Sequence, residues 1–290
     1  MASETKTVGL IGLGLMGQAL ATRLIPAGFR VLGYDIDAAK GTRLKATGGE
    51  AASLADVAKC GTVLLAVFST DQVEDVTENT LVPAAGGGKI VLCTSTCDPD
   101  RIATLAARVE PKGIRFLETP VSGSSGQVSR GEGTGLIGGD PATAAEVDDI
   151  LTALYPRRFH IGKAGDAGRA KLAINLILGL NRMALAEGIV FASRLGLDAK
   201  AFLDVARASA AYSQVMDIKG RKMVEREFKP EGFVHQSLKD FALMHDQASK
   251  LGQTLPALEL NKSLLEACVR AGEADYDNSA VIEEIRRRYK

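Results

Sequence analysis

The first half of the chain alternates short apolar runs with longer amphipathic stretches. The apolar runs are rich in Val, Ile and Leu, which is typical of strands buried on both faces of a parallel sheet. They span Thr7–Ile11, Arg30–Tyr34, Thr62–Val67, Lys89–Cys93, Ile114–Glu118 and Arg158–Ile161. Ala-rich stretches of helical length lie between them, at Gly14–Ala27, Ala38–Thr47, Pro99–Val109 and Pro141–Leu154. This alternation predicts an α/β fold with a doubly wound parallel sheet. The run Thr134–Ile137 fits a strand or a buried helix equally well.

From Asp166 onward the pattern is helical throughout. Lys171–Leu195 is apolar on most sides, which predicts one long buried helix. Further helical periods follow at Ala199–Ala208, Ser237–Leu251, Pro256–Ala271 and Ser279–Tyr289. We therefore expect two domains: a Rossmann-type sheet domain over residues 1–163 and an all-α domain over residues 164–290.

A glycine motif joins the first predicted strand to the first predicted helix. It consists of Gly12, Leu13, Gly14, Leu15, Met16 and Gly17, a G-x-G-x-x-G. After a strand and before a helix, such glycines permit a tight turn, close approach of a pyrophosphate and close helix–strand packing. The N–H groups at the helix start favour phosphate. We predict a dinucleotide site here; a purely structural glycine turn is the alternative.

Asp35 ends the second predicted strand, 18 residues after Gly17. This is close to the spacing of the acid that binds the ribose hydroxyls in dinucleotide sites. A carboxylate there repels a 2′-phosphate, and no Arg stands at positions 36 to 38. We therefore expect NAD as the cofactor and NADP as the less favoured one. An ordinary loop aspartate is the alternative.

Composition and charge narrow the partners. The 290 residues contain 35 Lys and Arg and 35 Asp and Glu, so the formal net charge is zero. This balance provides no basic field for nucleic acid or a membrane surface, and no secretory signal is evident at the start of the chain. The four cysteines lack zinc-ligand spacing, and a reduced, cytoplasmic location fits them best. We expect no metal, no nucleic-acid partner and no membrane partner.

Elimination leaves one catalytic candidate. The sequence contains no H-E-x-x-H and no Tyr-x-x-x-Lys. Lys171 stands at the start of the long apolar helix, and Asn175, four residues on, shares its face. Apolar neighbours desolvate a lysine, which favours its neutral form and suits proton exchange near neutral pH. A solvent-exposed lysine with an ordinary polar neighbour remains the alternative.

A third region, Glu118–Gly126, follows a predicted strand at the edge where such sheets bind ligands. Its backbone N–H groups and hydroxyls are suited to holding a carboxylate. As an isolated loop, it is only a flexible turn.

Together these motifs resemble the β-hydroxyacid dehydrogenase family over nearly the whole chain. The family includes 3-hydroxyisobutyrate dehydrogenases and reductases of tartronate semialdehyde, succinic semialdehyde and glyoxylate. The matching segments are Gly12–Gly17 (G-L-G-x-M-G), Ser95-Thr96, Pro120–Gly123 (P-V-S-G), Lys171 with Asn175, and Lys239-Asp240.

The resemblance implies a role for each matched residue. Lys171 exchanges a proton with the substrate oxygen while hydride passes to or from the nicotinamide, and Asn175 holds that oxygen or the lysine. Ser122 and Gly123 bind the substrate carboxylate, and the other substrate-binding residues are Ser124, Asn175 and Asp240. Phe68, Ser69 and Thr96 line the nicotinamide, and Lys239 reaches the cofactor from the helical domain. The family also implies a homodimer or homotetramer joined through the helical domain.

The chain departs from the family pattern at several positions. Ser124 stands where a second glycine is usual, Gln127 replaces a small residue, and Glu132-Gly133 replaces Thr-Leu. Ala167-Gly168 stands in place of Gly and Gln. The departures near the substrate loop leave open which small hydroxy acid or semialdehyde is used. A non-catalytic dinucleotide-binding module on the same fold is the alternative of another class.

Overall fold

The computed structural model describes residues 6–86 and 88–288 of the chain. It divides into two compact units, Met1–Lys171 and Leu172–Lys290. The boundary between them falls inside a helix, eight residues after the boundary expected from the sequence.

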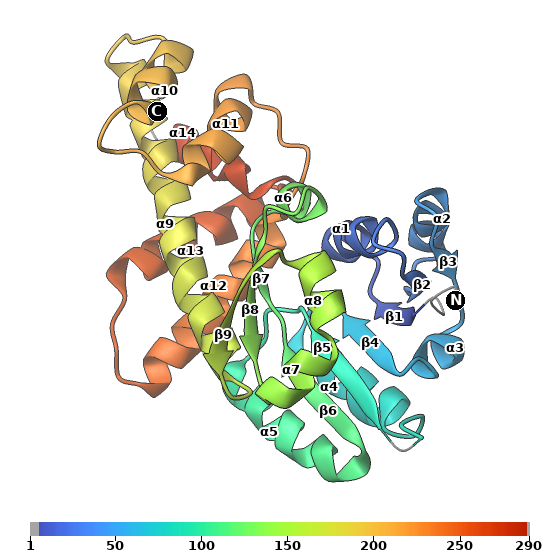
Figure 1. The fold of residues 1–290 in the computed structure, drawn as a ribbon. Helices are drawn as coiled ribbons and strands as arrows, with labels where there is room; N and C mark the ends of the chain where they lie inside the picture. The colour runs from blue at the N-terminus through green and yellow to red at the C-terminus, as the bar shows by residue number, and fades with distance from the viewer. Residues whose placement is uncertain (1–5, 87, 289–290) are drawn as a thin grey trace. The chain divides into compact units, whose positions relative to one another are not determined.

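Over its described residues, the first unit is built on a nine-stranded sheet (Figure 1). Its strands are β1 (Thr7–Ile11), β2 (Arg30–Tyr34), β3 (Glu50–Ala51), β4 (Thr62–Leu65), β5 (Lys89–Cys93), β6 (Ile114–Glu118), β7 (Val121–Ser122), β8 (Thr134–Gly138) and β9 (Arg157–Gly162). The order is β3-β2-β1-β4-β5-β6-β8-β7, with β9 paired to β8. The pairs from β3 to β6 are parallel, whereas β8 runs antiparallel to both β6 and β7. The predicted doubly wound parallel sheet is confirmed, with the difference that β8 runs antiparallel to its neighbours β6 and β7.

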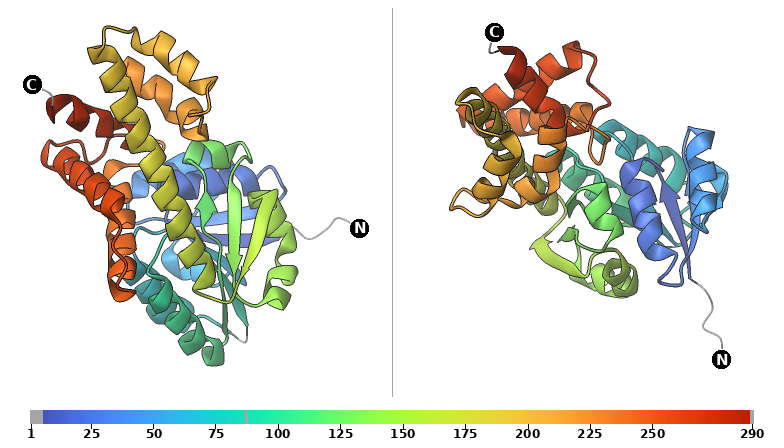
Figure 2. Two further views of the ribbon diagram at one scale, coloured as in Figure 1. Left: turned by 90° about the vertical axis from the view of Figure 1, so that its left-hand side faces the viewer. Right: turned by 90° about the horizontal axis from the view of Figure 1, so that it is seen from above.

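Helices cover both faces of this sheet (Figure 2). They are α1 (Leu15–Leu24), α2 (Ala38–Ala46), α3 (Leu54–Ala58), α4 (Thr70–Val76), α5 (Pro99–Val109), α6 (Ser125–Ser129), α7 (Pro141–Glu146) and α8 (Asp148–Leu154), with a π-helical turn at Thr77–Leu81 and a 3-10 turn at Glu110–Lys112. One apolar core joins the sheet to α1 and α8, and the other joins it to α3, α4 and α5. Strands buried between two helical layers explain the continuous apolar runs in the sequence.

Local details differ from the sequence-based expectation. The ambiguous run Thr134–Ile137 is a strand, β8. The single helix expected over Pro141–Leu154 is two helices, because Val147 leaves helical geometry with φ −112° and ψ 22°.

The second unit is helical. It contains most of α9 (Asp166–Arg194), followed by α10 (Ala199–Arg207), α11 (Arg221–Glu225), α12 (Val234–Lys250), α13 (Pro256–Arg270) and α14 (Val281–Arg288), with a π-helical turn at Met216–Gly220 and a 3-10 turn at Asn278–Ala280. Two apolar clusters hold these helices together. Short α11 was not anticipated, because a single turn and a half carries no readable periodicity.

The long helix α9 begins five residues earlier than expected. The expectation that it is buried on most sides is wrong for the single chain, since Ile177 is 62% exposed and Phe191 66% exposed. Among the described helices, α9 alone has the length and apolarity that a membrane span needs, with 39% of its most apolar window buried. The same properties belong to core helices of soluble proteins.

Candidate active site

The site residues expected in the first unit follow the carboxyl ends of successive parallel strands. Gly12–Gly17 follow β1, Asp35 follows β2, Phe68 and Ser69 follow β4, Thr96 follows β5, and Ser122–Ser124 follow β6. Open α/β sheets bind ligands at this edge. The fold therefore brings these separate motifs to one edge of one sheet.

The glycine loop has the geometry that a bound pyrophosphate needs. Gly12 has φ +95°, and a Cβ there would lie 2.5 Å from the carbonyl oxygen of Ala66. A Cβ on Gly17 would lie 2.0 Å from the carbonyl oxygen of Gly12. Beside Gly14, by contrast, no atom of the surrounding described residues comes within 4 Å of the Cβ position. Helix α1 starts there with no side-chain cap and no acidic residue in its first turn, so its N–H groups suit an anion.

Asp35 is bonded to the glycine loop itself. Its Oδ2 accepts a hydrogen bond from the N–H of Leu13 at 2.8 Å, and its Oδ1 accepts one from the N–H of Asp37 at 2.9 Å. Burial disfavours the charged carboxylate, but these bonds and Lys40 outweigh it and lower the pKa of Asp35. Asp35 is therefore anionic at neutral pH and aligns the loop after β1 with the end of β2.

Lys40 on α2 is a residue that the sequence analysis missed. Its Nζ lies 3.2 Å from Oδ1 of Asp35, and its carbonyl oxygen accepts a hydrogen bond from Nε2 of Gln18 at 2.9 Å. Lys40 thus places a cation against the carboxylate assigned to the ribose. The spacing rule that identified Asp35 contains no information about this lysine.

The loops after β4 and β5 are tied together by hydroxyl groups. Thr94 Oγ1 donates to the carbonyl oxygen of Leu65 at 2.8 Å, and Ser95 Oγ donates to that of Val67 at 2.7 Å. Ser69 caps α4, and its hydroxyl and Gln72 form a reciprocal capping box. The loops that carry Phe68, Ser69 and Thr96 are therefore fixed by side chains from both sides.

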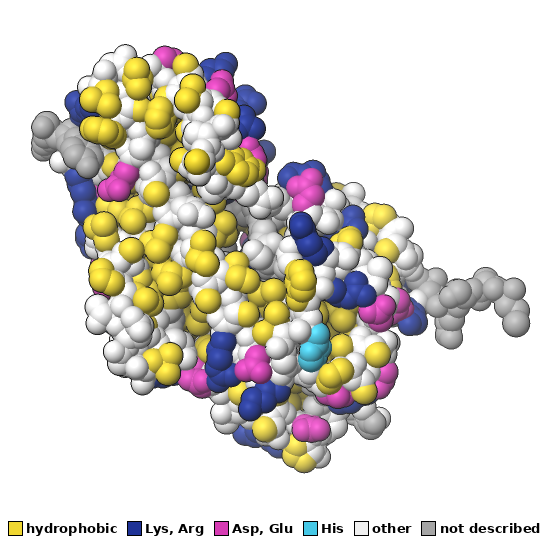
Figure 3. Space-filling view, turned by 60° about the vertical axis from the view of Figure 1, so that its left-hand side comes forward, with side chains coloured by type: hydrophobic (Ala, Val, Ile, Leu, Met, Phe, Trp, Pro, Cys, Tyr) yellow, Lys and Arg dark blue, Asp and Glu magenta, His cyan; other side chains and the backbone are white. Residues whose placement is uncertain are grey.

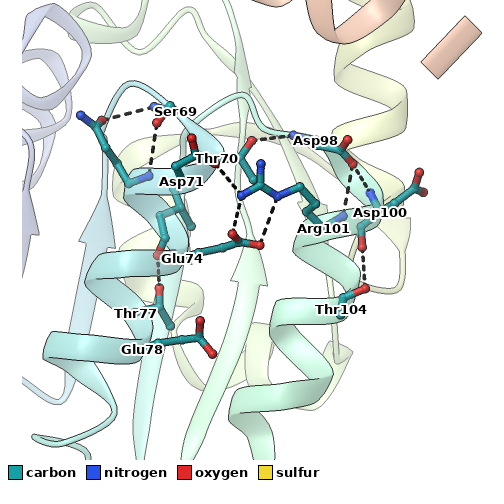
Figure 4. Close-up of polar contacts among 12 residues, drawn as sticks. Ser69, Thr70, Asp71, Glu74, Thr77, Glu78, Asp98, Asp100, Arg101 and Thr104 are labelled. Atoms are coloured by element: carbon teal, nitrogen blue, oxygen red, sulfur yellow. Dashed lines mark hydrogen bonds and ion pairs between the residues drawn. The ribbon is translucent and has the colours of Figure 1, made fainter. Parts of the chain in front are cut away.

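An ion-pair cluster behind these loops joins α4 to α5 (Figure 4). Arg101 on α5 pairs with Asp71 at 2.6 Å and with Glu74 at 2.5 Å, both on α4. The N–H of Asp98 donates to Oγ1 of Thr70 at 2.9 Å. These partially exposed pairs contribute little to global stability, but they link the two helices that follow the loops assigned to the nicotinamide.

The structure of the substrate loop explains two of the departures from the family pattern, Ser124 and Gln127. Ser124 is the N-cap of α6: its Oγ accepts from the N–H of Gln127, and Oε1 of Gln127 accepts from the N–H of Ser124 at 2.9 Å. The unusual serine and the unusual glutamine therefore form one capping box. Gly123 just before it has φ +146°, a conformation that favours glycine.

A third departure is also structural. A Cβ at position 133 would lie 2.9 Å from Val121 and 2.9 Å from Val128. Gly133 therefore lets β7 and α6 pack closely behind Ser122.

Lys171 lies in the second turn of α9 and is 7% exposed. Asn175 follows one helical turn later, so both side chains leave the same face of α9. In the second unit, Nδ2 of Asn175 donates to Oδ2 of Asp240 at 3.0 Å. The other oxygen of Asp240 lies 3.1 Å from Nζ of Lys239. The structure thus brings together Asn175, Lys239 and Asp240, three expected residues from two helices.

Buried charges that the sequence analysis missed lie in the same unit. Lys219 forms an ion pair with the fully buried Asp277, with Nζ–O distances of 2.9 and 2.8 Å. Arg182 is 6% exposed, and burial lowers its pKa to about 10 against the opposing pull of Asp277 and Asp240. Arg182 lies two turns after Asn175 on α9. Its positive charge therefore lies near Asp240, the residue that accepts the hydrogen bond from Asn175. Within the described ranges, no three His, Cys, Asp or Glu side chains gather as metal ligands.

Comparison with known protein families covers nearly the whole chain. Residues 7–162 match the family described as the NAD-binding domain of 6-phosphogluconate dehydrogenase. Residues 165–285 match the family described as NAD-binding of NADP-dependent 3-hydroxyisobutyrate dehydrogenase.

Individual relatives align from end to end. L-threonate dehydrogenase of Cupriavidus necator is 29% identical over 284 residues, which cover 96% of each protein. The 2-hydroxy-3-oxopropionate reductase of Escherichia coli is 28% identical over 283 residues, again 96% of each protein. Among solved structures, 3-hydroxyisobutyrate dehydrogenase from Salmonella typhimurium superimposes with a TM-score of 0.88 at 26% identity, covering 96% of this chain and 99% of that one.

Proposed function

The chain belongs to the β-hydroxyacid dehydrogenase family of NAD(P)-binding oxidoreductases, and we propose that it interconverts a small 3-hydroxy acid and its semialdehyde or keto acid. The observation that carries this proposal is the buried Lys171 with Asn175 one turn further along α9. The family match supplies the reaction class, and these two side chains supply a proton-exchanging group beside an orienting amide.

In this account, Lys171 acts as acid and base. During oxidation, neutral Lys171 accepts the hydroxyl proton of the substrate as the hydride leaves the adjacent carbon; during reduction, it returns that proton to the carbonyl oxygen. When bound, the dinucleotide would supply a nicotinamide ring as hydride acceptor or donor. Asn175 holds the reacting oxygen or the lysine, and the carboxylate end of the substrate is bound by Ser122, Gly123 and Ser124.

We infer a preference for NAD over NADP. The anionic Asp35 can accept hydrogen bonds from ribose hydroxyls and opposes a 2′-phosphate. The next residue, Ile36, is 89% exposed and provides apolar surface where an arginine would be needed to bind that phosphate. Lys40 weakens the preference for NAD, because its positive charge partly neutralises Asp35. The inferred preference is therefore a matter of degree.

The substrate is proposed as a class rather than a single compound. The Ser124–Gln127 capping box replaces flexible glycine with a fixed hydroxyl at the edge of the loop. A small hydroxy acid of the 3-hydroxyisobutyrate type fits the family match. Tartronate semialdehyde, succinic semialdehyde and glyoxylate are the alternatives within the same chemistry.

We also propose that the protein is a homodimer or homotetramer assembled through its helical unit. On the face turned toward the viewer in Figure 3, hydrophobic side chains gather over α9 and its neighbours. The exposed apolar residues of this unit include Ile177, Phe191, Leu195, Leu197 and Val205. An apolar face of this kind is typical of the surface that a second copy covers.

A substrate panel tests the proposed function. Purified protein is incubated with small 3-hydroxy acids and NAD or NADP, and with the matching semialdehydes and NADH or NADPH, while absorbance at the reduced-nicotinamide band is followed. Turnover with at least one pair supports the proposal. Tight cofactor binding without turnover across the panel would instead identify a non-catalytic dinucleotide-binding module.

A further inference from the structure

Glu118 carries a buried carboxylate that the proposed reaction does not use. It is the last residue of β6 and is 4% exposed. Its Oε2 accepts a hydrogen bond from the N–H of Gly165 at 2.5 Å, and its Oε1 accepts one from the N–H of Gly168 at 3.1 Å. A further backbone bond comes from Ala167. Gly165 immediately precedes α9, and Ala167 and Gly168 lie in its first turn.

The surrounding backbone is shaped to admit this carboxylate. A Cβ on Gly138 would lie 2.8 Å from Oε2 of Glu118, and a Cβ on Gly168 would lie 2.8 Å from Oε1. Gly165 has φ +97°, which turns its N–H toward the same group. Gly168 also stands where the family pattern has glutamine, so this departure makes room for the carboxylate of Glu118.

The charged and titratable groups around Glu118 come from three elements. Arg169 on α9 attracts the carboxylate and is itself held by Asp100 on α5 at 2.7 Å and by Asp166 at 2.8 Å. From β5, the buried thiol of Cys93 also faces Glu118. Burial raises the pKa of Glu118 to about 7, although the three backbone bonds and Arg169 oppose the rise. The carboxylate therefore changes its charge close to neutral pH.

We propose that Glu118 is a positioning residue for Lys171, because its carboxylate fixes the first turn of the helix from which Lys171 projects. Gly168 precedes Lys171 by three residues, less than one helical turn, so the bonded N–H group and the lysine share one rigid segment. An anion at this end of a 29-residue helix also interacts favourably with the helix dipole. The inference rests on the proposed function, in which Lys171 exchanges the proton.

The test compares Glu118→Gln with a matched control, Asp140→Asn. Asp140 likewise accepts N–H bonds at a helix start, from Ala142 and Thr143 of α7, but it is exposed. For each protein, hydrogen exchange over residues 163–172 and the pH profile of kcat are measured. We expect Glu118→Gln to accelerate exchange in this segment and to lower kcat at least about tenfold at pH 8. We also expect the activity of wild type to fall as the pH drops through about 7, and the activity of Glu118→Gln not to show this fall. Asp140→Asn should change neither the hydrogen exchange over residues 163–172 nor the pH profile of kcat.

A second perturbation keeps the test decisive if Glu118→Gln is poorly folded. Gly168→Ala leaves Glu118 in place but puts a methyl group against its carboxylate. This variant should also show faster exchange over residues 163–172 and a lower kcat. Wild-type exchange over residues 163–172 in folded Glu118→Gln would overturn the inference, as would faster exchange with an unchanged kcat and pH profile. Lys171→Ala is assayed in parallel: wild-type kcat there would contradict the proposed function itself, while the exchange data would still decide whether Glu118 holds α9.

Discussion

The side-chain amide of Asn175 donates through Nδ2 to Oδ2 of Asp240 at 3.0 Å, across the gap between α9 and α12. This bond determines which way the amide faces: its NH₂ group points toward α12, so its oxygen lies on the opposite side. The ammonium group of Lys239 forms an ion pair with the second oxygen of Asp240 at 3.1 Å. Asp240, which the family resemblance assigns to the substrate, is thus also placed to orient Asn175.

Asp240→Asn should therefore lower kcat by about 10–100-fold, because a charge-assisted hydrogen bond worth about 1.5–3 kcal/mol no longer orders Asn175. Steady-state turnover checks this. Asp246→Asn, an exposed change on the same helix, is the control and should leave kcat unchanged. If Asp240→Asn folds normally and turns over at the wild-type rate, the amide does not depend on Asp240.

Cofactor preference provides a second prediction. Wild type should show a higher kcat/KM with NAD than with NADP. Asp35→Asn should lower the ratio of kcat/KM with NAD to kcat/KM with NADP, because it removes the charge that opposes a 2′-phosphate. Adding Ile36→Arg should reduce the preference for NAD further or reverse it, since guanidinium binds phosphate in a bidentate manner. Lys40 remains in both variants as a nearby cation. An equal or better kcat/KM with NADP in wild type would contradict the preference.

The exposed face of α9 predicts self-association. Light scattering at micromolar concentration should give at least twice the 30.5 kDa of the chain. Phe191→Glu places a charge in the exposed apolar face and should shift the protein toward monomer. Arg221→Glu, an exposed change on α11 outside this apolar set, should not. A stable wild-type monomer would refute the assembly proposal.

Glu118 makes stability depend on pH in a defined direction. Its pKa in the folded protein, about 7, lies above its usual value of 4.5. The folded state thus holds this proton more tightly than the unfolded chain does, so the stability it contributes is complete below pH 4.5 and is lost as the pH rises to about 7. The full difference corresponds to about 3 kcal/mol.

Chemical denaturation at pH 5 and pH 8 measures this effect. Wild type should lose more unfolding free energy between the two pH values than Glu118→Gln, which has no titrating group at this position. Parallel losses in the two proteins would show that Glu118 titrates normally.

Much of the fold could be predicted because parallel strands buried on both faces appear as continuous apolar runs. The predicted bounds of β1, β2, β5 and β6 coincide with the observed strands. The two-residue strands β3 and β7 were missed, because a pair of residues has no periodicity. The antiparallel direction of β8 was missed as well, since it depends on its pairing with β6 and β7.

Some features of the candidate site could likewise be predicted from the sequence, and others could not. Motifs that act within a few residues, such as the glycine loop after β1, could be recognised from spacing. Contacts between distant segments could not: Glu118 and Gly165 are 47 residues apart, and Asn175 and Asp240 are 65 apart. The buried Arg182 illustrates the same limit, because its sequence neighbours do not indicate that two carboxylates lie near it.

The turnover of Lys171→Ala tests the central claim most directly. If Lys171 exchanges the substrate proton, this change should lower kcat by about 10²–10⁴, with cofactor titration little altered because the glycine loop and Asp35 are untouched. Lys171→Arg should be nearly as inactive, since guanidinium keeps its proton, and Asn175→Ala should lose less. A folded, cofactor-binding Lys171→Ala protein with near wild-type kcat would contradict the account.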